Sequence, residues 1–513
     1  MLIKTYGAAP IGVDAVLITV EVHTTPGYDF RMVGLPDNAV KESHDRIVAA
    51  LMVNKFGHLN HSFIINLAPA DIKKQGSAYD LTIAIAMLAG TEKIKTTHLR
   101  EYMIMGELSL DGSLQPIKGA LPFALCAKQE GFKGIIVPHQ NAQEAAIVEG
   151  LAVYGMQSLM EVVQFLNDET VMEPVHIDIE KEFEDTNQFF EMDFSEVRGQ
   201  ENVRRAAEIA VAGGHNMLMI GPPGAGKSMI AKRIPTIMPS LTLEEALETT
   251  KIHSVAGLTR SLITRRPFRS PHHTISDVAL VGGGTNPMPG EISLAHNGVL
   301  FLDELPEYKR SALEVLRQPL EDRKICISRA KMTIEYPSSF MLIAAMNPCP
   351  CGHYGEIETA HPCTCSPLQV KKYMGRISGP LLDRIDIQCY IQSVKYDQLR
   401  NTQPAESSAA IRERVIKARK IQQARFAKLG IYCNAQMTPK MLRTFCVLDT
   451  KGEEALRYAM TKLDLSARAY DRILKVARTI ADLAGSAEIA AVHIAEAIGY
   501  RNLDRSDWAE RGR

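Results

Sequence analysis

The sequence feature that most constrains this chain is a glycine-rich loop between an apolar strand and a helix. Asn216–Ile220 has the pattern of a buried strand, and Lys227–Ile234 has that of a helix. Glycines let backbone N–H groups close around a phosphate, and the N-terminus of the following helix favours an anion. The loop matches the G-x-x-x-x-G-K-[ST] pattern in full. It predicts a nucleotide-phosphate site made of Gly221, Pro222, Pro223, Gly224, Ala225, Gly226, Lys227 and Ser228.

A pair of acidic residues downstream agrees with this site. Residues Gly298–Leu302 form a buried-strand pattern that ends in Asp303 and Glu304. The first carboxylate can hold Mg²⁺ together with the hydroxyl of Ser228, and the second can polarise an attacking water. Lys227 would reach the β- and γ-phosphates. The sequence therefore predicts ATP and Mg²⁺ as cofactors, although an acidic pair after a strand is common by itself.

The chain divides by pattern into four parts. Residues 1–166 alternate between strand-like and helix-like stretches, and residues 196–393 repeat strand, glycine loop and helix, which is typical of a parallel α/β sheet. Residues 402–513 are mainly helical. Residues 167–195 are acidic without a clear period, which favours a solvated linker, with a docking segment as the alternative. We therefore predict an α/β multidomain protein with a helical C-terminal part, and the family resemblance described below implies that this part is a lid over the nucleotide.

Composition restricts the cellular context. The net charge of −1 attracts neither DNA nor a membrane, so any nucleic-acid contact must come from local patches or a pore. The longest apolar run, Leu81–Ala89, is far shorter than the ~20 residues that span a bilayer. Nine cysteines are an odd number and too sparse for a disulfide scaffold. We expect a cytoplasmic protein with reduced thiols and no membrane partner.

Four of the nine cysteines lie in two close pairs. These are Cys349, Cys351, Cys363 and Cys365. Four thiolates suit a tetrahedral Zn²⁺, although each pair is C-x-C, which is tighter than the usual C-x₂-C. His353 and His361 are alternative ligands, and unpaired loop thiols are the alternative to a metal site. We predict a structural zinc that stiffens the loop.

Several motifs together resemble a known family. Phe194-x-x-Val197-x-Gly199-Gln200 resembles the adenine-side entry of AAA+ ATPases, and residues 289–298, which lead into LFLDE, resemble the magnesium-chelatase branch. Residues 267–273 and 465–470 extend the likeness. Over nearly all 513 residues the chain is similar to the bacterial ComM/YifB family. The resemblance implies a P-loop AAA+ core.

The resemblance assigns roles to further residues. Val197, Gly199 and Gln200 would lie on the adenine side. Asn347 would be the sensor that positions the attacking water, Arg384 the arginine finger given to a neighbouring subunit, and Arg468 the second sensor on the lid. A finger acting in trans requires a ring, and the family implies a homo-hexamer. Without the family resemblance, Asn347 is interpreted as a turn residue. Arg384 is then a surface residue that pairs with Asp383 or Asp386, and Arg468 is one of several basic residues on a helix.

Basic residues of two insertions are the DNA-binding candidates. Cys326–Tyr336 has the pattern of two short strands around a tight turn, and the resemblance implies a pore hairpin that carries Arg329 and Lys331. The second insertion, Leu258–Gly284, carries further candidates, namely Arg265, Arg266 and Arg269. Six copies would make a positive channel for single-stranded or branched DNA. Ordinary surface charges are the alternative.

The N-terminal part is similar to the proteolytic domain of Lon proteases. That resemblance implies an α+β, ribosomal-protein-S5-like fold with a serine nucleophile and a lysine base. Here Ala78 stands at the serine position and Leu121 at the lysine position, while Ser77 and Lys118 are shifted from them. We expect no protease activity.

The resemblance implies a DNA helicase that promotes branch migration of recombination intermediates in natural transformation. The alternatives are an ATP-dependent protein-remodelling motor of the chelatase kind and a Lon-like protease. DNA-stimulated ATP turnover would separate the first alternative from a DNA motor, and casein degradation would reveal the second.

Overall fold

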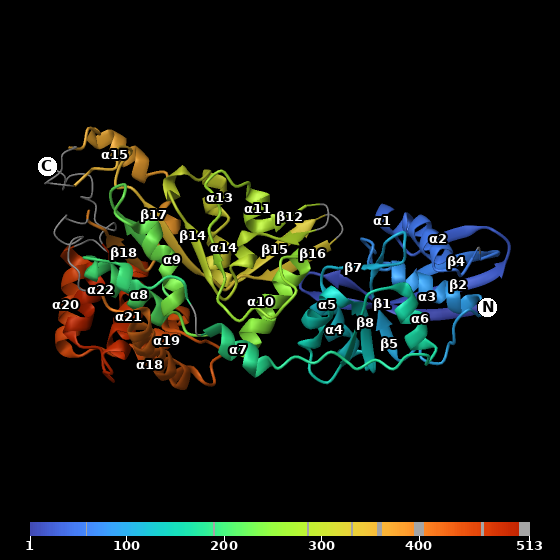
Figure 1. Ribbon diagram of the computed structural model, residues 1–513. Helices are drawn as coiled ribbons and strands as arrows, with labels where there is room; N and C mark the ends of the chain where they lie inside the picture. The colour runs from blue at the N-terminus through green and yellow to red at the C-terminus, as the bar shows by residue number, and fades with distance from the viewer. Residues whose placement is uncertain are drawn as a thin grey trace.

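The computed structural model describes residues 1–57, 59–187, 190–284, 287–329, 332–355, 362–393, 405–462 and 466–501. Figure 1 shows the N-terminal region in blue and cyan on one side, a central sheet in green and yellow, and a group of C-terminal helices in orange and red on the other side. No helix in the described part of the chain is long and apolar enough to cross a membrane.

The N-terminal region contains two larger sheets around one core. The first has the order β1-β2-β4-β3, with β1 (Leu2–Ile11), β2 (Asp14–Pro26) and β4 (His61–Ala68) antiparallel and β3 (Phe30–Val33) parallel to β4. The second is parallel and consists of β5 (Tyr102–Ile104), β8 (Gly134–Pro138) and β9 (Ala152–Met156). Every residue of α3 (Asp80–Gly90) is buried against this core, which explains its almost uninterrupted apolar sequence. The other larger helices of the region are α2 (Ser43–Val53), α4 (Ala120–Gln129), α5 (His139–Ala146) and α6 (Leu159–Leu166).

The acidic segment after residue 166 is more structured than a solvated linker. It contains α7 (Ile179–Asn187), and its apolar side chains, among them Val175 and Phe183, pack against the N-terminal core. Val175 N–H also donates to Val153 O at 2.8 Å. Widely spaced apolar residues among the carboxylates thus hold part of this segment on the N-terminal region.

The central sheet is wholly parallel. Its order is β11-β14-β17-β10-β18, and its strands are β10 (Met217–Ile220), β11 (Phe268–Arg269), β14 (Val299–Leu302), β17 (Met341–Met346) and β18 (Ile387–Tyr390). Met217 and Met219 enter one apolar core, and Leu218 and Ile220 enter another. Because both faces are covered, the strands are apolar at every position rather than alternating. The predicted parallel α/β core is confirmed.

The elements beside the sheet complete these two cores. One face carries α8 (Glu201–Gly213) and α9 (Lys227–Ile237). The other core includes the hairpin of β15 (Lys324–Arg329) and β16 (Met332–Pro337), which are antiparallel. This confirms the two short strands expected there. Helix α10 (Leu243–Ala256) packs instead against α4 of the N-terminal region, and Lys251 Nζ lies 3.1 Å from Asp14 Oδ1.

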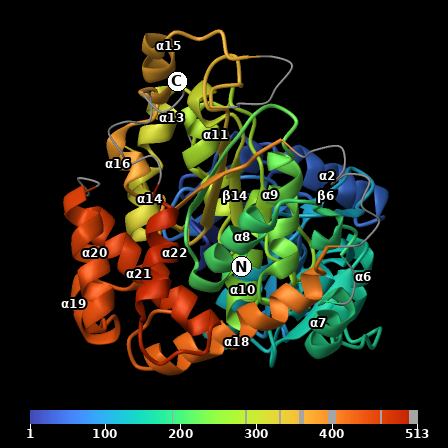
Figure 2. The ribbon, with the colours of Figure 1, turned by 90° about the vertical axis from the view of Figure 1, so that its left-hand side faces the viewer.

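The C-terminal part is a cluster of helices. They are α18 (Ser408–Phe426), α19 (Pro439–Phe445), α20 (Thr450–Lys462), α21 (Ala467–Leu483) and α22 (Ala491–Gly499). In Figure 2 they gather below and beside α8, and both α18 and α21 contact α8. The patterns of Ile411–Phe426, Leu465–Leu483 and His493–Gly499 predict three helices, which correspond to α18, α21 and α22, whereas no pattern predicted α19 or α20.

Candidate functional site

The glycine loop connects β10 to α9 at the carboxyl edge of the central sheet. Gly224 and Gly226 have φ values of 77° and 88°, in the left-handed region that favours glycine. Helix α9 begins directly after Gly226, so its first N–H groups face the loop. A cavity of about 390 Å³ opens here, and it is lined by Pro223, Gly224, Ala225, Gly226, Lys227, Ser228, Met229, Asp303, Glu304, Met346 and Asn347. The loop and both acidic residues predicted for the site therefore meet at one cavity.

Lys227 is held inside the loop by three acceptors. Its Nζ donates to Gly221 O at 2.7 Å, to Pro222 O at 2.8 Å and to Asn347 Oδ1 at 3.0 Å. Burial lowers the pKa of this ammonium, while the charges of Asp303 and Glu304 oppose that shift. A phosphate in the cavity would offer a stronger acceptor than these carbonyls.

The acidic residues occupy the end of β14, as predicted. Asp303 Oδ2 accepts from Ser228 Oγ at 2.6 Å, which places a hydroxyl and a carboxylate oxygen together. Such hard oxygen donors fit Mg²⁺. Glu304 has φ of 50°, an unusual conformation for a residue with a side chain, and its side chain is 57 % exposed. Strained backbone of this kind is concentrated at functional sites.

The sequence reasoning missed the partner of Glu304. His273 Nδ1 lies 3.2 Å from Glu304 Oε2, and the rings of His272 and His273 are 4.1 Å apart. In the sequence alone, adjacent histidines are more typical of a polar loop than of a metal site, so the pattern predicts no role for His272 and His273. Both histidines lie in the insertion before β14. They are distant from Glu304 along the sequence, so no local motif indicated that His273 and Glu304 are in contact.

The adenine-side candidates lie beside the last strand of the sheet. Val197 is fully buried, Gly199 has φ of 65°, and Gln200 Nε2 donates to Gln392 O at 2.7 Å. None of the three lines the cavity at the glycine loop. Their contact with adenine stays a prediction.

The two arginines expected to act on the phosphates lie outside the cavity of their own chain. The side chain of Arg384 is 9 % exposed, and its guanidinium donates to Pro380 O at 2.6 Å and pairs with Glu321. Arg468, at the start of α21, is 69 % exposed and lies 3.0 Å from Asp383. The role of Arg384 in a neighbouring subunit would require its release from Glu321.

Two of the basic residues expected to contact DNA are engaged within the protein. Arg266 donates to Pro239 O, Asn297 O and Glu245, and Arg269 forms two hydrogen bonds of 2.6 Å with Glu291. Their guanidinium groups are satisfied by side chains and carbonyls that the sequence could not place. Contact of Arg266 and Arg269 with DNA stays a prediction, and it would require these intramolecular pairs to open.

The remaining basic candidates are Arg265, Arg329 and Lys331. The guanidinium of Arg265 lies 5.4 Å from the ring centre of Phe190, a cation–π contact. Arg329 is the last residue of β15, at the tip of the hairpin. Lys331 lies outside the described residues. Their contact with DNA stays a prediction.

The four predicted cysteines converge just beyond β17. Their sulfurs lie within 4.8 Å of one another. Cys349 Sγ is 3.3 Å from Cys351 Sγ and 3.7 Å from Cys363 Sγ, and the Cys351–Cys363 distance is 3.5 Å. Tetrahedral Zn²⁺ with bonds of ~2.3 Å places sulfurs about 3.8 Å apart, so the donor set fits this ion. His353 is not part of the group, and His361 lies outside the described residues.

The thiols of this cluster differ in pKa. Burial acts to raise the pKa of Cys351, but hydrogen bonds from the backbone of His353 and Thr364 lower it to about 6. Burial raises the pKa of Cys363 to about 12, and the neighbouring thiols add to this effect. A divalent cation would stabilise all four thiolates together.

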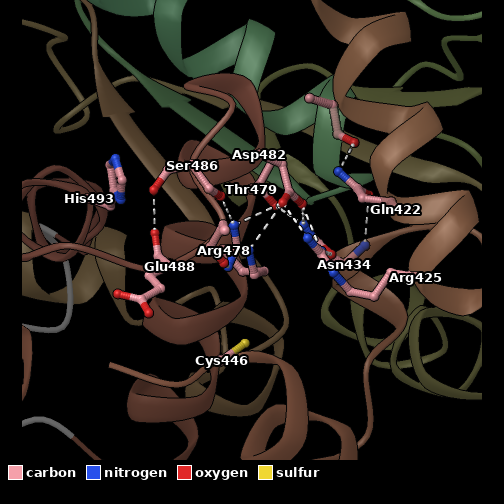
Figure 3. Close-up of polar contacts among 12 residues, drawn as sticks. Gln422, Arg425, Asn434, Cys446, Arg478, Thr479, Asp482, Ser486, Glu488 and His493 are labelled. Atoms are coloured by element: carbon pink, nitrogen blue, oxygen red, sulfur yellow. Dashed lines mark hydrogen bonds and ion pairs between the residues drawn. The ribbon is translucent and has the colours of Figure 1, made fainter. Parts of the chain in front are cut away.

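Buried polar contacts fasten the C-terminal helices to the sheet. Figure 3 shows Asp482 of α21 facing Arg425, Asn434 and Arg478, and the hydrogen bond to Asn434 Nδ2 is 2.8 Å. Thr479, one turn earlier on α21, contacts His215, which precedes β10 of the sheet.

His215, just before β10, links this cluster to the loop that carries Arg384. Its Nε2 lies 2.8 Å from Thr479 Oγ1 and its Nδ1 lies 3.1 Å from Asp386 Oδ2. Arg472 of α21 pairs with the other oxygen of Asp386 at 2.9 Å. Helix α21 and residues 383–386 are thus joined by polar contacts.

In the N-terminal region, the residues at and beside the Lon-like positions do not form a serine–lysine pair. Leu121 is fully buried in the core, and Ala78 packs against the same core. Ser77 Oγ donates to Glu107, while the stem of Lys118 lies against Gly257 in the central region. The residues at these positions give no nucleophile and base in contact.

Comparison with known proteins identifies the family. Residues 20–141 match the profile described as "Subunit ChlI of Mg-chelatase", residues 193–399 match "Magnesium chelatase, subunit ChlI", and residues 405–501 match its C-terminal profile. The chain is 45% identical to "Competence protein ComM" of Haemophilus influenzae, over 98% of this chain and 97% of that protein. It belongs to the ComM/YifB family of magnesium-chelatase-like AAA+ proteins.

Other relatives agree with this family. "Uncharacterized protein YifB" of Escherichia coli is 44% identical over 97% of this chain and 96% of its own length. "Lon protease 2" of Bacillus subtilis is 28% identical over 28% of this chain and 26% of its own length, so the Lon-like similarity is partial. Membership of the ComM/YifB family agrees with an ATP and Mg²⁺ site at the glycine loop.

Proposed function

We propose that this protein is an ATP-hydrolysing DNA motor that works as a homo-hexamer and promotes branch migration of recombination intermediates in natural transformation. The observation that carries the proposal is the meeting of Lys227, Ser228, Asp303, Glu304 and Asn347 around one cavity. P-loop phosphoryl transfer uses these same groups: a glycine loop with its lysine, a hydroxyl, two carboxylates and an amide.

Each of these side chains has a distinct task in hydrolysis. Lys227 neutralises charge on the transferring phosphoryl group, and the N–H groups of the glycine loop hold the other phosphates. Ser228 and Asp303 hold Mg²⁺, which when bound shields the phosphate charge. Glu304, whose carboxylate is exposed at the cavity, orients water and accepts its proton, and Asn347 supports that water from beside Lys227.

The DNA part of the proposal is supported by a relative and by the hairpin. The name of the Haemophilus relative connects the family with competence. Strand β15 of the hairpin ends in a basic residue, Arg329, and Arg265 lies in the second insertion. Repeated six times around a pore, such residues would contact the phosphates of single-stranded or branched DNA.

A protein-remodelling motor is the second candidate. The matching profiles are described by a magnesium chelatase subunit, and the internal pairing of Arg266 and Arg269 reduces the positive surface available to DNA. Such a motor would hydrolyse ATP without stimulation by DNA.

ATP turnover with and without DNA tests the choice. We expect single-stranded and four-way-junction DNA to raise turnover by the wild type, with stimulation that falls as salt increases. The Lys227→Ala variant should show no turnover under either condition. Native mass measurement with ATP should give a hexamer. Turnover that ignores DNA at low salt would contradict the DNA motor and favour a protein client.

A further inference from the structure

The cysteine cluster is a direct continuation of the nucleotide site. Strand β17 ends at Met346, and Met346 and Asn347 both line the nucleotide cavity. Cys349, the first cysteine of the cluster, follows two residues later and is fully buried. Since Asn347 Oδ1 also accepts from Lys227 at 3.0 Å, the backbone that enters the cluster carries a side chain of the site.

The turn formed by residues 349–352 packs against the glycine loop. Gly352 N–H donates to Cys349 O at 3.0 Å, which closes the turn. A Cβ atom added to Gly352 would lie 2.5 Å from Pro223 Cδ and 2.7 Å from Pro223 Cγ. Real Cβ atoms do not approach that closely, so only glycine fits here, and Pro223 itself lines the nucleotide cavity.

The residues that follow this turn are attached to β18, the edge strand of the sheet. Tyr390 ends β18 and its hydroxyl donates to Tyr354 O at 3.3 Å. The described start of the cysteine loop, residues 349–355, therefore lies between the ends of β17 and β18, with the glycine loop of β10 in contact with it. A metal that fixes the shape of this loop would fix its contact with Pro223.

We propose that a Zn²⁺ ion held by Cys349, Cys351, Cys363 and Cys365 sets the affinity of the nucleotide site, because the folded turn at Gly352 supports the glycine loop at Pro223. Gly352 and Pro223 act as positioning residues and do not touch the reacting atoms. Loss of the metal releases the turn and lets the glycine loop relax from its phosphate-binding shape. This inference rests on the proposed binding of ATP in the cavity.

Two glycines of the cysteine loop provide a matched pair of variants. Gly352 and Gly355 have φ values of 90° and 83°, so Ala strains the backbone similarly at both positions. A Cβ at Gly355 would meet only Tyr390 Oη at 3.9 Å, whereas one at Gly352 would collide with Pro223. The two variants therefore separate contact with the glycine loop from backbone strain.

The test measures zinc content by elemental analysis and the Kd of a fluorescent ATP analogue on the full chain. We expect Gly352→Ala to keep its zinc and to bind the nucleotide about tenfold more weakly, which corresponds to about 1.4 kcal/mol. Gly355→Ala should keep both zinc and affinity within about twofold. Gly352→Ala should weaken binding less in a Pro223→Ala background than in wild type, because the ring atoms with which the added Cβ collides are then absent.

Metal removal provides a second measurement on the unmodified chain. Protein stripped of zinc with a chelator, then freed of the chelator and assayed in excess Mg²⁺, should bind the analogue more weakly by a similar factor while its circular dichroism spectrum is unchanged, and added Zn²⁺ should restore the affinity. Equal affinity for Gly352→Ala and wild type, or full affinity in the zinc-free protein, would overturn the proposal. Absence of zinc from freshly purified protein would also overturn it. If wild type with bound zinc does not bind the analogue at all, the proposed ATP site itself has failed.

Discussion

Ser228 Oγ lies 2.6 Å from Asp303 Oδ2, so the first turn of α9 and the end of β14 contact each other at the carboxyl edge of the sheet. The two residues come from separate segments of the chain, and their oxygens are suitable ligands for one divalent cation. The assignment of the cavity as a Mg²⁺–nucleotide site depends on this contact.

Replacement of either oxygen ligand should change the metal requirement. In Ser228→Ala and Asp303→Asn we expect the Mg²⁺ concentration for half-maximal ATP turnover to rise by roughly tenfold or more, because one hard ligand is lost. The Ser228→Thr variant keeps the hydroxyl and should behave like wild type. Mg²⁺ titrations that coincide for wild type and Asp303→Asn would refute this metal site.

The lysine and the glutamate should separate binding from chemistry. Lys227→Ala should abolish turnover, since the charge that meets the phosphates is gone. Glu304→Gln should bind ATP normally but hydrolyse it about 10²–10⁴-fold more slowly, which is the range for loss of a general base. Nucleotide affinity and single-turnover hydrolysis measure the two effects. Unchanged turnover in either variant would remove the role assigned to that residue.

Arg384 should act on a neighbouring subunit. Arg384→Ala should fold and bind nucleotide but lose hydrolysis by about 10³–10⁵-fold, as for other arginine fingers. Mixing Arg384→Ala with Lys227→Ala should restore turnover, because the second variant supplies a finger to the intact site of the first. A mixture as inactive as its components would argue that Arg384 serves only its pairing with Glu321.

His215 should make stability depend on pH. Burial lowers the pKa of His215 below its ordinary 6.5, so the folded protein binds fewer protons at this residue than the unfolded chain. Stability from this residue is therefore present above pH 6.5 and is lost as pH falls below it. Asp386, Thr479, Arg472 and Lys475 surround this group.

Urea unfolding at pH 7.5 and pH 5.5 measures this effect. His215→Asn should be less stable than wild type by about 1–2 kcal/mol at pH 7.5, since one buried hydrogen bond is lost. Its stability should fall less than that of wild type on acidification. His139 is exposed, so the control variant His139→Asn should keep the wild-type pH dependence. If His215→Asn loses as much stability as wild type between pH 7.5 and pH 5.5, the assignment to His215 is contradicted.

The sequence predicts the features that depend on contiguous residues. The loop at 221–228 and the strand that ends in Asp303 and Glu304 are local patterns, and because both follow parallel strands they had to meet at one edge of the sheet. The cysteine pairs were recognisable for the same reason.

Features that depend on distant partners were not predictable. Arg266 and Arg269 resemble free basic residues until Glu245 and Glu291 are brought beside them by the fold. The contact of Gly352 with Pro223 likewise joins two loops that follow different strands. Sequence periodicity reports which face of an element is apolar, but it does not report which side chain lies opposite.

The most direct test of the central claim is ATP-dependent conversion of a synthetic mobile four-way DNA junction, with wild type and Lys227→Ala compared at equal concentration. The proposed function predicts that wild type separates the arms only with ATP and Mg²⁺ and that Lys227→Ala does not. Robust ATP turnover by the wild type without any conversion of the junction would contradict branch migration.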